Sequence, residues 1–260
     1  MIMMEPRNLE EVLYPLPYPG RGILIGNSKD GKRAVIVYFI MGRSENSRNR
    51  IFAKTADGIR TKAHDPSKLT DPSLIIYHPV RVIDGRTIVT NGDQTDTVRD
   101  YLADGKDFRT ALLTREFEPD APNYTPRISG LVEQDGSYTL SILKSANGNP
   151  DACHRYFYEY STPIPGTGHF ISTYMGYDTY GDEPLLSFAS EPYSVKVSLS
   201  NGLTDFALSI WYALNKDNRV SLYARELDIA SGDLLSDIII NERANIPAHK
   251  QAALTPMEDK

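Results

Sequence analysis

The stretch Asn91-Gly92-Asp93-Gln94-Thr95-Asp96-Thr97 joins a strand-like run, Thr87–Thr90, to a helix-like run, Val98–Leu102. Because glycine tolerates positive φ without steric cost, the Asn-Gly pair allows the backbone to turn sharply. Thr95, Asp96 or Thr97 can then cap the helix that follows. The pattern predicts a polar loop at a helix N-terminus, where free N–H groups and the helix dipole favour an anion or polar ligand. A capped turn that binds nothing is the alternative.

Short apolar runs separated by turn residues surround this stretch and predict antiparallel pairing. The expected hairpins are Gly20–Gly26 with Arg33–Ile40, Ile51–Thr55 with Ile59–Ala63, Val80–Ile83 with Thr87–Thr90, and Arg127–Val132 with Tyr138–Leu143. Single strands are expected at Leu74–Tyr77 and Arg155–Tyr160, and a fifth hairpin, turning at Lys216-Asp217-Asn218, is expected at Phe206–Leu214 with Val220–Ala224. In the last two, apolar residues occupy every second position, which is strand periodicity.

Two helices, Val98–Leu102 and Phe108–Arg115, interrupt the strand series near the middle of the chain. Many hairpins, few helices and no repeat of fixed period predict an α+β domain whose antiparallel sheets are covered by helices. We expect residues 1–17 to be an N-terminal lead-in, residues 18–241 a single domain, and residues 242–260 a tail. Pro163–Glu183 is predicted to be the least regular region, either a long functional loop or a partner surface.

The composition describes an ordinary globular protein, with 260 residues, 40% hydrophobic and 24% charged. A net charge of −6 argues against a general nucleic-acid surface or an anionic-membrane surface. It leaves room for one basic pocket that holds a small phosphorylated ligand. Met41–Arg50 is the most basic loop, and we interpret it either as solvated charge or as an arginine rim for a phosphate.

The sequence contains no pattern typical of disulfide, metal-site or nucleophile chemistry. Cys153 is the single cysteine, so no intramolecular disulfide can form, and we expect an inert thiol in a loop. The five histidines show no metal-ligand spacing. No Gly-x-Ser-x-Gly elbow occurs, and Met1-Ile2-Met3 offers no N-terminal nucleophile. Neither a signal peptide nor a membrane-length apolar run is found, so a cytoplasmic location is expected.

The order of several motifs resembles that of the archaeal-type IMP cyclohydrolases. The resemblance extends from Tyr18 to Leu227, and its most specific parts are the Asn91–Thr97 loop and the strand start Thr125-Pro126-Arg127-Ile128. It also includes Tyr18-Pro19-Gly20-Arg21-Gly22, Asn49-Arg50, Ile75-Ile76-Tyr77 and the segment Phe206–Glu226. This chain departs from the family pattern by Asp93-Gln94 inside the loop, an inserted Tyr124 and a longer Pro163–Glu183 region.

The resemblance implies a four-layer αββα sandwich of the N-terminal-nucleophile hydrolase type, with two mainly antiparallel sheets and outer helices. It also implies closure of the purine ring, in which a formamido-imidazole-carboxamide ribonucleotide loses water to give IMP. The implied partner is therefore a purine ribonucleotide, and no cofactor or metal is implied.

Matching positions supply the candidate site residues. Arg50 and Tyr77 resemble the family's site arginine and tyrosine, and Glu118 is the candidate for its acidic residue. Arg50 could stabilise oxygen charge, Tyr77 could pass a proton, and Glu118 could accept from the carboxamide. Taken alone, each could instead be a core-edge or surface residue. The candidates for substrate binding are Arg21, Asn49, Asn91, Gly92, Thr95, Asp96, Thr125 and Arg127.

Two other function classes stay open at this point. The first is a purine-nucleotide sensor that binds on the same fold without turnover. The second is an amide hydrolase that acts on another substrate in the same pocket. A homo-oligomer is compatible with each of these functions.

Overall fold

The computed structural model describes residues 5–69, 72, 74–177 and 184–243. Within these residues the chain forms two sheets, and every pairing between named strands is antiparallel. The predicted α+β class is therefore confirmed. The first sheet has the order β11 (Tyr193–Lys196), β10 (Thr167–Ser172), β1 (Arg21–Asn27), β2 (Arg33–Met41), β12 (Arg219–Asp228), β13 (Leu234–Asn241). The second runs in chain order: β3 (Arg50–Thr55), β4 (Gly58–Ala63), β5 (Val80–Ile83), β6 (Arg86–Thr90), β7 (Arg127–Val132), β8 (Tyr138–Ala146), β9 (Asn149–Tyr160).

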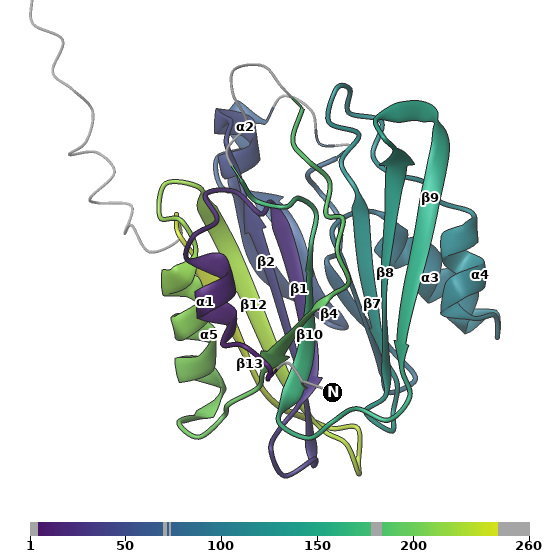
Figure 1. The fold of residues 1–260 in the computed structure, drawn as a ribbon, viewed down its shortest axis with the longest axis vertical. Coiled ribbons are helices and arrows are strands. Elements are labelled where there is room, and N and C mark those ends of the chain that lie inside the picture. The colour runs from purple at the N-terminus through teal and green to yellow at the C-terminus, as the bar shows by residue number, and fades with distance from the viewer. Residues whose placement is uncertain (1–4, 70–71, 73, 178–183, 244–260) are drawn as a thin grey trace, which may run out of the picture.

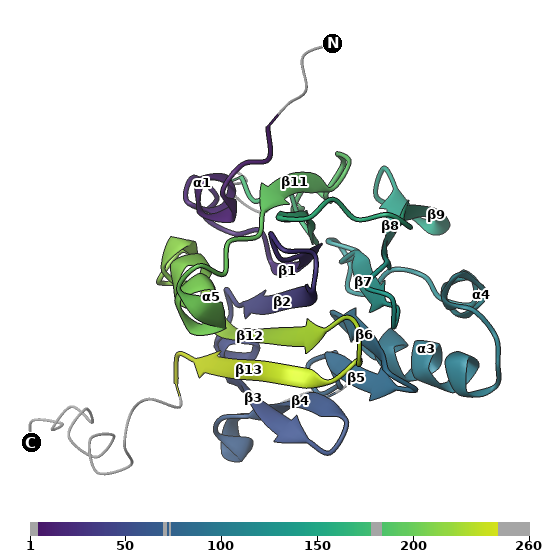
Figure 2. The same ribbon diagram turned by 90° about the horizontal axis from the view of Figure 1, so that it is seen from below.

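The helices lie on the outer faces of the two sheets (Figures 1 and 2). α1 (Leu9–Leu13) and α5 (Gly202–Ala213) cover the first sheet, and α3 (Gln94–Ala103) and α4 (Phe108–Leu113) cover the second. Two short elements, α2 (Glu45–Arg48) and the 3-10 helix η1 (Pro66–Lys68), lie in connections.

Alternation along β2 shows how one strand serves two cores. Ile36 and Tyr38 face the second sheet, whereas Val37 and Phe39 face α1 and α5. All four are at most 1% exposed, because successive side chains of a strand point to opposite faces and both faces here are covered. This explains why the strand reads as a continuous apolar run.

Four of the five predicted hairpins form. At the tip between β5 and β6, Asp84 and Gly85 have φ values of 48° and 71°. Positive φ at both central residues is what a two-residue type I′ turn requires, and its twist matches that of the flanking strands. The predicted helices also form, although the first begins at Gln94 rather than Val98.

The strand predicted at Phe206–Leu214 is wrong, because this segment belongs to helix α5. Its buried residues are Leu203, Phe206, Ala207, Ile210 and Trp211, which recur at the helical spacing i, i+3, i+4, i+7, i+8. Tyr212, which the alternating pattern would bury, is 70% exposed. The alternation resulted from apolar residues that lie at the edges of the helical stripe.

Several other expectations need correction. Leu74–Tyr77 forms turns rather than a strand, and Cys153 lies on β9 rather than in a loop. The lead-in contains α1, whose Leu9 and Leu13 are buried in the first sheet's outer core. The Pro163–Glu183 region includes strand β10, whereas its residues 178–183 lie outside the described part of the chain, as do residues 1–4 and most of the expected tail. Among the residues described, no helix has the length and apolar character needed to cross a membrane.

Candidate functional site

Five polar side chains from distant parts of the chain form one buried cluster at one end of the sheets. Its members are Arg21 at the start of β1, Tyr38 on β2, Arg50 at the start of β3, Tyr77 before β5 and Glu118 after α4. We call this set the buried cluster. It contains all three predicted catalytic residues and one of the predicted binding residues.

Arg50 is 1% exposed and only partly satisfied. Its Nε donates to the Ser47 carbonyl at 2.7 Å, and its Nη2 donates to the Met41 carbonyl at 3.3 Å. Its Nη1 is buried and has no partner among the residues the structure describes. Burial, helped by the positive charge of Arg21, lowers the pKa of Arg50. A negatively charged oxygen at this point would therefore gain a donor that the protein leaves free.

Arg21 lies beside Glu118, with Nη2 3.9 Å from Oε2. Burial by itself lowers the pKa of Arg21, but the Glu118 carboxylate raises that pKa well above its usual value. The Arg21 Nε is also buried without a hydrogen-bond partner in the described part of the chain. The cluster thus holds two arginines, each with an unsatisfied N–H group, and one carboxylate.

Glu118 is 2% exposed, and burial raises the pKa of its carboxyl group even though Arg21 and Arg127 act to lower it. Its backbone N–H donates to the Thr125 carbonyl at 2.9 Å, which fixes the segment after α4 against the start of β7. A carboxyl whose pKa is raised by burial takes up a proton more readily than an ordinary surface glutamate.

The Tyr77 hydroxyl lies 2.8 Å from the Tyr38 hydroxyl. The backbone of Tyr77 is held by Thr61, whose N–H donates to the Tyr77 carbonyl at 2.9 Å and whose Oγ1 accepts from the Tyr77 N–H at 2.8 Å. Burial raises the pKa of Tyr38 well above its usual value, and the neighbouring Tyr77 adds to this effect. Tyr38 therefore stays protonated and can donate to Tyr77, which leaves the Tyr77 proton for another acceptor.

The Asn91–Thr97 loop and the start of β7 support this cluster from one side. Arg127 Nη1 donates to Gln94 Oε1 at 2.7 Å and lies 2.6 Å from Asp93 Oδ1. A Cβ on Gly92 would lie 2.5 Å from that same Nη1 and 3.6 Å from Glu118 Oε1. Glycine at this position therefore lets the ends of these side chains approach the backbone closely. The positive φ that the sequence suggested is not used, since the φ of Gly92 is not positive.

Thr125 lies on the other side of the same strand start. Its Oγ1 hydrogen bonds to Asp120, and it lies 2.6 Å from the Tyr174 hydroxyl. The Tyr174 ring stacks on Tyr18 at 6.1 Å between centroids, and the Arg43 guanidinium lies 5.0 Å from the Tyr18 ring centroid. Of the basic loop at Met41–Arg50, Arg48 is engaged by the Gly42 carbonyl and by Asn218.

The side chains of three predicted binding residues, Asn49, Asn91 and Thr95, form hydrogen bonds within the protein. Asn49 exchanges two bonds with the Asp65 backbone, both of 2.8 Å. Asn91 accepts from the Ile128 N–H and donates to the Pro126 carbonyl, and Thr95 donates to the Gly92 carbonyl. All three are 0% exposed, and their hydrogen bonds hold the surrounding loops in shape.

Asp96, another predicted binding residue, makes its ion pairs with residues outside the buried cluster. It pairs with Arg81 at 2.8 Å and lies 3.7 Å from His78. The expectation that Thr95, Asp96 or Thr97 caps α3 is also wrong, because the helix begins at Gln94 and its N-cap residue is Asp93.

Sequence reasoning missed three contributors: Tyr38, Gln94 and Asp93. Tyr38 was visible only as one apolar position of a predicted strand, and no local signal marked its hydroxyl as paired. Asp93 and Gln94 were noted as departures from the family pattern, and both contact Arg127. The available signal was that a carboxylate and an amide in this loop are suitable partners for Arg127, a predicted binding residue. No group of three or more metal-ligating side chains occurs among the described residues.

Comparison with known proteins places these features in context. The family model described as "IMP cyclohydrolase-like protein" matches residues 18–231. The chain is 29% identical over 178 residues to an IMP cyclohydrolase of Methanopyrus kandleri, covering 67% of this chain and 83% of that protein. It is 29% identical over 161 residues to the IMP cyclohydrolase of Methanosphaera stadtmanae, covering 60% and 73%. Against that of Methanocaldococcus jannaschii it is 30% identical over 125 residues, covering 46% and 59%.

Proposed function

The chain belongs to the IMP cyclohydrolase-like protein family, and we propose that it closes the purine ring of a formamido-imidazole-carboxamide ribonucleotide, with loss of water, to give IMP. The observation that carries this proposal is a pair of arginines, the buried Arg50 and the largely buried Arg21, beside a carboxyl and a tyrosine; each has an N–H group without a partner among the described residues. Family membership supplies the substrate class, and the cluster supplies the residue types that the reaction requires.

The reaction needs a site that compensates for a poor nucleophile. A carboxamide nitrogen must attack the formyl carbon, and negative charge then develops on the former formyl oxygen. Holding the two groups together supplies effective molarity. Donors placed at the developing charge lower the barrier further, and more so in a buried site. In this proposal the free N–H groups of Arg50 and Arg21 face that oxygen.

Loss of water needs a proton delivered to the departing hydroxyl, and Tyr77 is the proposed donor. The Tyr38 hydroxyl, 2.8 Å away, supports this role. When Tyr38 donates to Tyr77, the Tyr77 proton is directed away from Tyr38 and toward the substrate. Tyr38 acts here as a positioning residue, because it works through Tyr77.

Glu118 is proposed to accept a proton from the attacking carboxamide and to return it to the former formyl oxygen, which becomes a hydroxyl. When Tyr77 protonates that hydroxyl and water leaves, the formamido N–H proton is released as the ring C=N bond forms, and this proton restores the Tyr77 hydroxyl. The raised pKa of Glu118, caused by burial, suits a group that takes up and releases a proton in one cycle. Arg127, Gly92 and Thr125 line the loops around it, so we propose them as substrate contacts, together with Arg21. Asn49, Asn91, Thr95 and Asp96 then support the shape of the site from behind.

Three further points belong to the same proposal. The paired sheets with outer helices are compatible with the four-layer αββα sandwich of the N-terminal-nucleophile hydrolase type, which family membership favours. We also propose that the domain extends over residues 18–241, and that the protein works in the cytoplasm, alone or as a homo-oligomer.

The direct test supplies the formamido nucleotide to the purified full chain and follows IMP formation in the ultraviolet. Wild-type turnover, with loss in an Arg50→Ala variant that binds the product and remains folded, supports the proposal. Nucleotide binding without any turnover would contradict it and identify a sensor. Hydrolysis of simple amides instead of ring closure would contradict it in favour of an amide hydrolase.

A further inference from the structure

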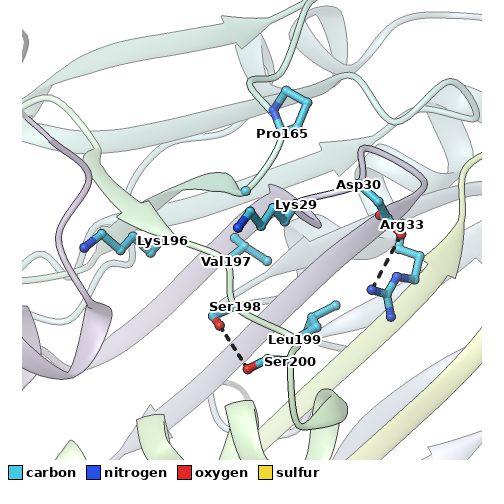
Figure 3. Close-up of a pocket in the computed structure, with 10 residues that line it drawn as sticks. Lys29, Asp30, Arg33, Pro165, Lys196, Val197, Ser198, Leu199 and Ser200 are labelled. Carbon is cyan, nitrogen blue, oxygen red and sulfur yellow. Dashed lines mark hydrogen bonds and ion pairs between the residues drawn. The ribbon is translucent and has the colours of Figure 1, made fainter.

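A pocket separate from the buried cluster lies at the opposite end of the first sheet (Figure 3). β1 leaves the cluster at Arg21 and reaches this pocket beyond Asn27, while β2 begins here at Arg33 and runs back to Met41. The pocket has a volume of about 600 Å³, within the range of small-molecule sites. It shares no residue with the buried cluster.

The lining of this pocket carries a local excess of positive charge. Lys29, Arg33 and Lys196 line the pocket together with one acidic residue, Asp30, although the whole chain has a net charge of −6. The Lys196 ammonium lies at the rim, directed away from Lys29 and the serines (Figure 3). Asp30 is already engaged, because it accepts from the Ser28 hydroxyl at 2.5 Å and from the Lys32 N–H at 3.1 Å. The hydrogen bond from Ser28 and that backbone bond lower the pKa of Asp30, so it stays ionised and bonded within its own turn.

The two lysines are the uncompensated charges. Arg33 is paired with Glu226 on β12 at 2.7 Å, whereas neither Lys29 nor Lys196 forms an ion pair with any residue that the structure describes. The Ser198 and Ser200 hydroxyls lie on the same wall, 3.5 Å apart, and can each donate to a ligand. Two ammonium groups and two hydroxyls are donors suited to phosphate oxygens.

The pocket walls are held in place by the backbone. The Gly166 N–H donates to the Asn27 and Ser28 carbonyls at 3.0 and 3.1 Å, and the Val197 N–H donates to the Gly166 carbonyl at 2.9 Å. These bonds tie the β1–β2 turn, the loop before β10 and the segment after β11 together. Pro165 and Leu199 add an apolar surface to the same lining. A preformed pocket loses less ordering entropy when a ligand binds.

We propose that this pocket binds a small phosphorylated molecule with an apolar ring, at a site separate from the buried cluster. Lys29 and the serine hydroxyls hold the phosphate, Lys196 adds positive charge at the rim, and the ring packs on Pro165 and Leu199. The arrangement does not depend on the ring-closing reaction, so a chain without turnover would still bind at this place.

The first experiment titrates the full chain with AMP in a calorimeter, and with inorganic pyrophosphate in a second arm. The variant Lys29→Gln/Lys196→Gln is compared with Lys62→Gln/Lys216→Gln, a control with the same change of charge on exposed residues outside the pocket. We expect AMP affinity at the pocket to weaken about tenfold or more in the first variant and less than about twofold in the control, because charged donors to phosphate are lost. Pyrophosphate should bind more weakly than AMP, because it lacks the ring. AMP isotherms that are identical in wild type and in the pocket variant would overturn the proposal.

The second experiment locates the site directly and is independent of the buried cluster. Pyridoxal 5′-phosphate is an aldehyde that condenses with a lysine amine with loss of water, and borohydride then reduces the imine to a stable secondary amine. Mass spectrometry should find Lys29 or Lys196 labelled before Lys62 and Lys216, and AMP should protect them. Uniform labelling of surface lysines, or labelling that AMP does not suppress, would count against the site.

Discussion

Variants of the hydroxyl pair Tyr38–Tyr77 allow an effect on catalysis to be distinguished from an effect on stability. Tyr77→Phe removes one hydroxyl from a side chain that is 6% exposed and keeps its ring. The Tyr38 hydroxyl, on a residue that is 0% exposed, then loses the only partner it has among the described residues. The change therefore has two consequences of different physical origin.

The first consequence concerns turnover, and the second concerns the free energy of unfolding. If Tyr77 delivers the proton, the rate of IMP formation should fall by about 10²–10⁴, the usual contribution of a general acid. Nucleotide affinity should change little, since the contact forms mainly in the transition state. Leaving the buried Tyr38 hydroxyl unsatisfied should cost about 1–3 kcal/mol of stability.

The double variant Tyr38→Phe/Tyr77→Phe separates these effects. Removing both hydroxyls leaves no orphan, so stability should return close to the wild-type value, while turnover stays low. Tyr223→Phe is the matched control, because Tyr223 lies opposite Tyr38 on β12 but its hydroxyl donates to Asp237 at 3.3 Å and not to a member of the cluster. The measurements are single-turnover IMP formation, nucleotide titration and denaturant unfolding. Undiminished turnover in Tyr77→Phe, or its recovery in the double variant, would refute the proton role.

Three further predictions concern charge and pH. Arg50→Lys should reduce turnover more than its retained charge suggests, because a planar fork becomes a point charge; equal turnover in a steady-state assay would exclude Arg50 from the reaction centre. Turnover should fall as pH drops through the pKa of Glu118, which burial raises above 4.5, and a pH–rate profile of Glu118→Gln should lack this acid limb. Burial lowers the pKa of His169 to about 4, so stability is present above its unfolded pKa near 6.5 and is lost as pH falls toward 4. The free energy of unfolding should be about 1–2 kcal/mol lower at pH 4.5 than at pH 7 after allowance for solvent screening, and this loss should be smaller in His169→Gln. An equal loss in both proteins, measured by denaturant unfolding, would contradict this assignment.

Local pattern was sufficient for the hairpins and for the two central helices. Asp84-Gly85 and the flanking β-branched residues specify a turn type and a register within a few residues, so no distant contact is needed to predict them. The same reasoning failed at Phe206–Leu214, where apolar residues satisfy both a period of two and the wider stripe of a helix. Only packing of Ile210 and Trp211 against the first sheet decides between these patterns.

The candidate site divides in the same way. The residues Arg50, Tyr77 and Glu118 could be named from motif order, and the structure brings them into one buried cluster with Arg21. Their roles as catalytic groups stay predictions. Asn91, central to the most specific motif, is instead fully used in holding the start of β7. A motif records which residues are needed, but it does not distinguish a ligand contact from a loop support.

The sequence by itself determined the α+β class, the hairpins and the family, because these depend on side-chain order over short distances. The tertiary structure alone decided that Tyr38 meets Tyr77, since the two tyrosines lie 39 positions apart along the chain. It also decided that two arginines have N–H groups without a partner in the described part of the chain. The same holds for the basic pocket, whose Lys29 and Lys196 come from the β1–β2 turn and the end of β11. Burial and hydrogen-bond satisfaction are properties of an environment assembled from distant segments, and no local stretch of sequence encodes them.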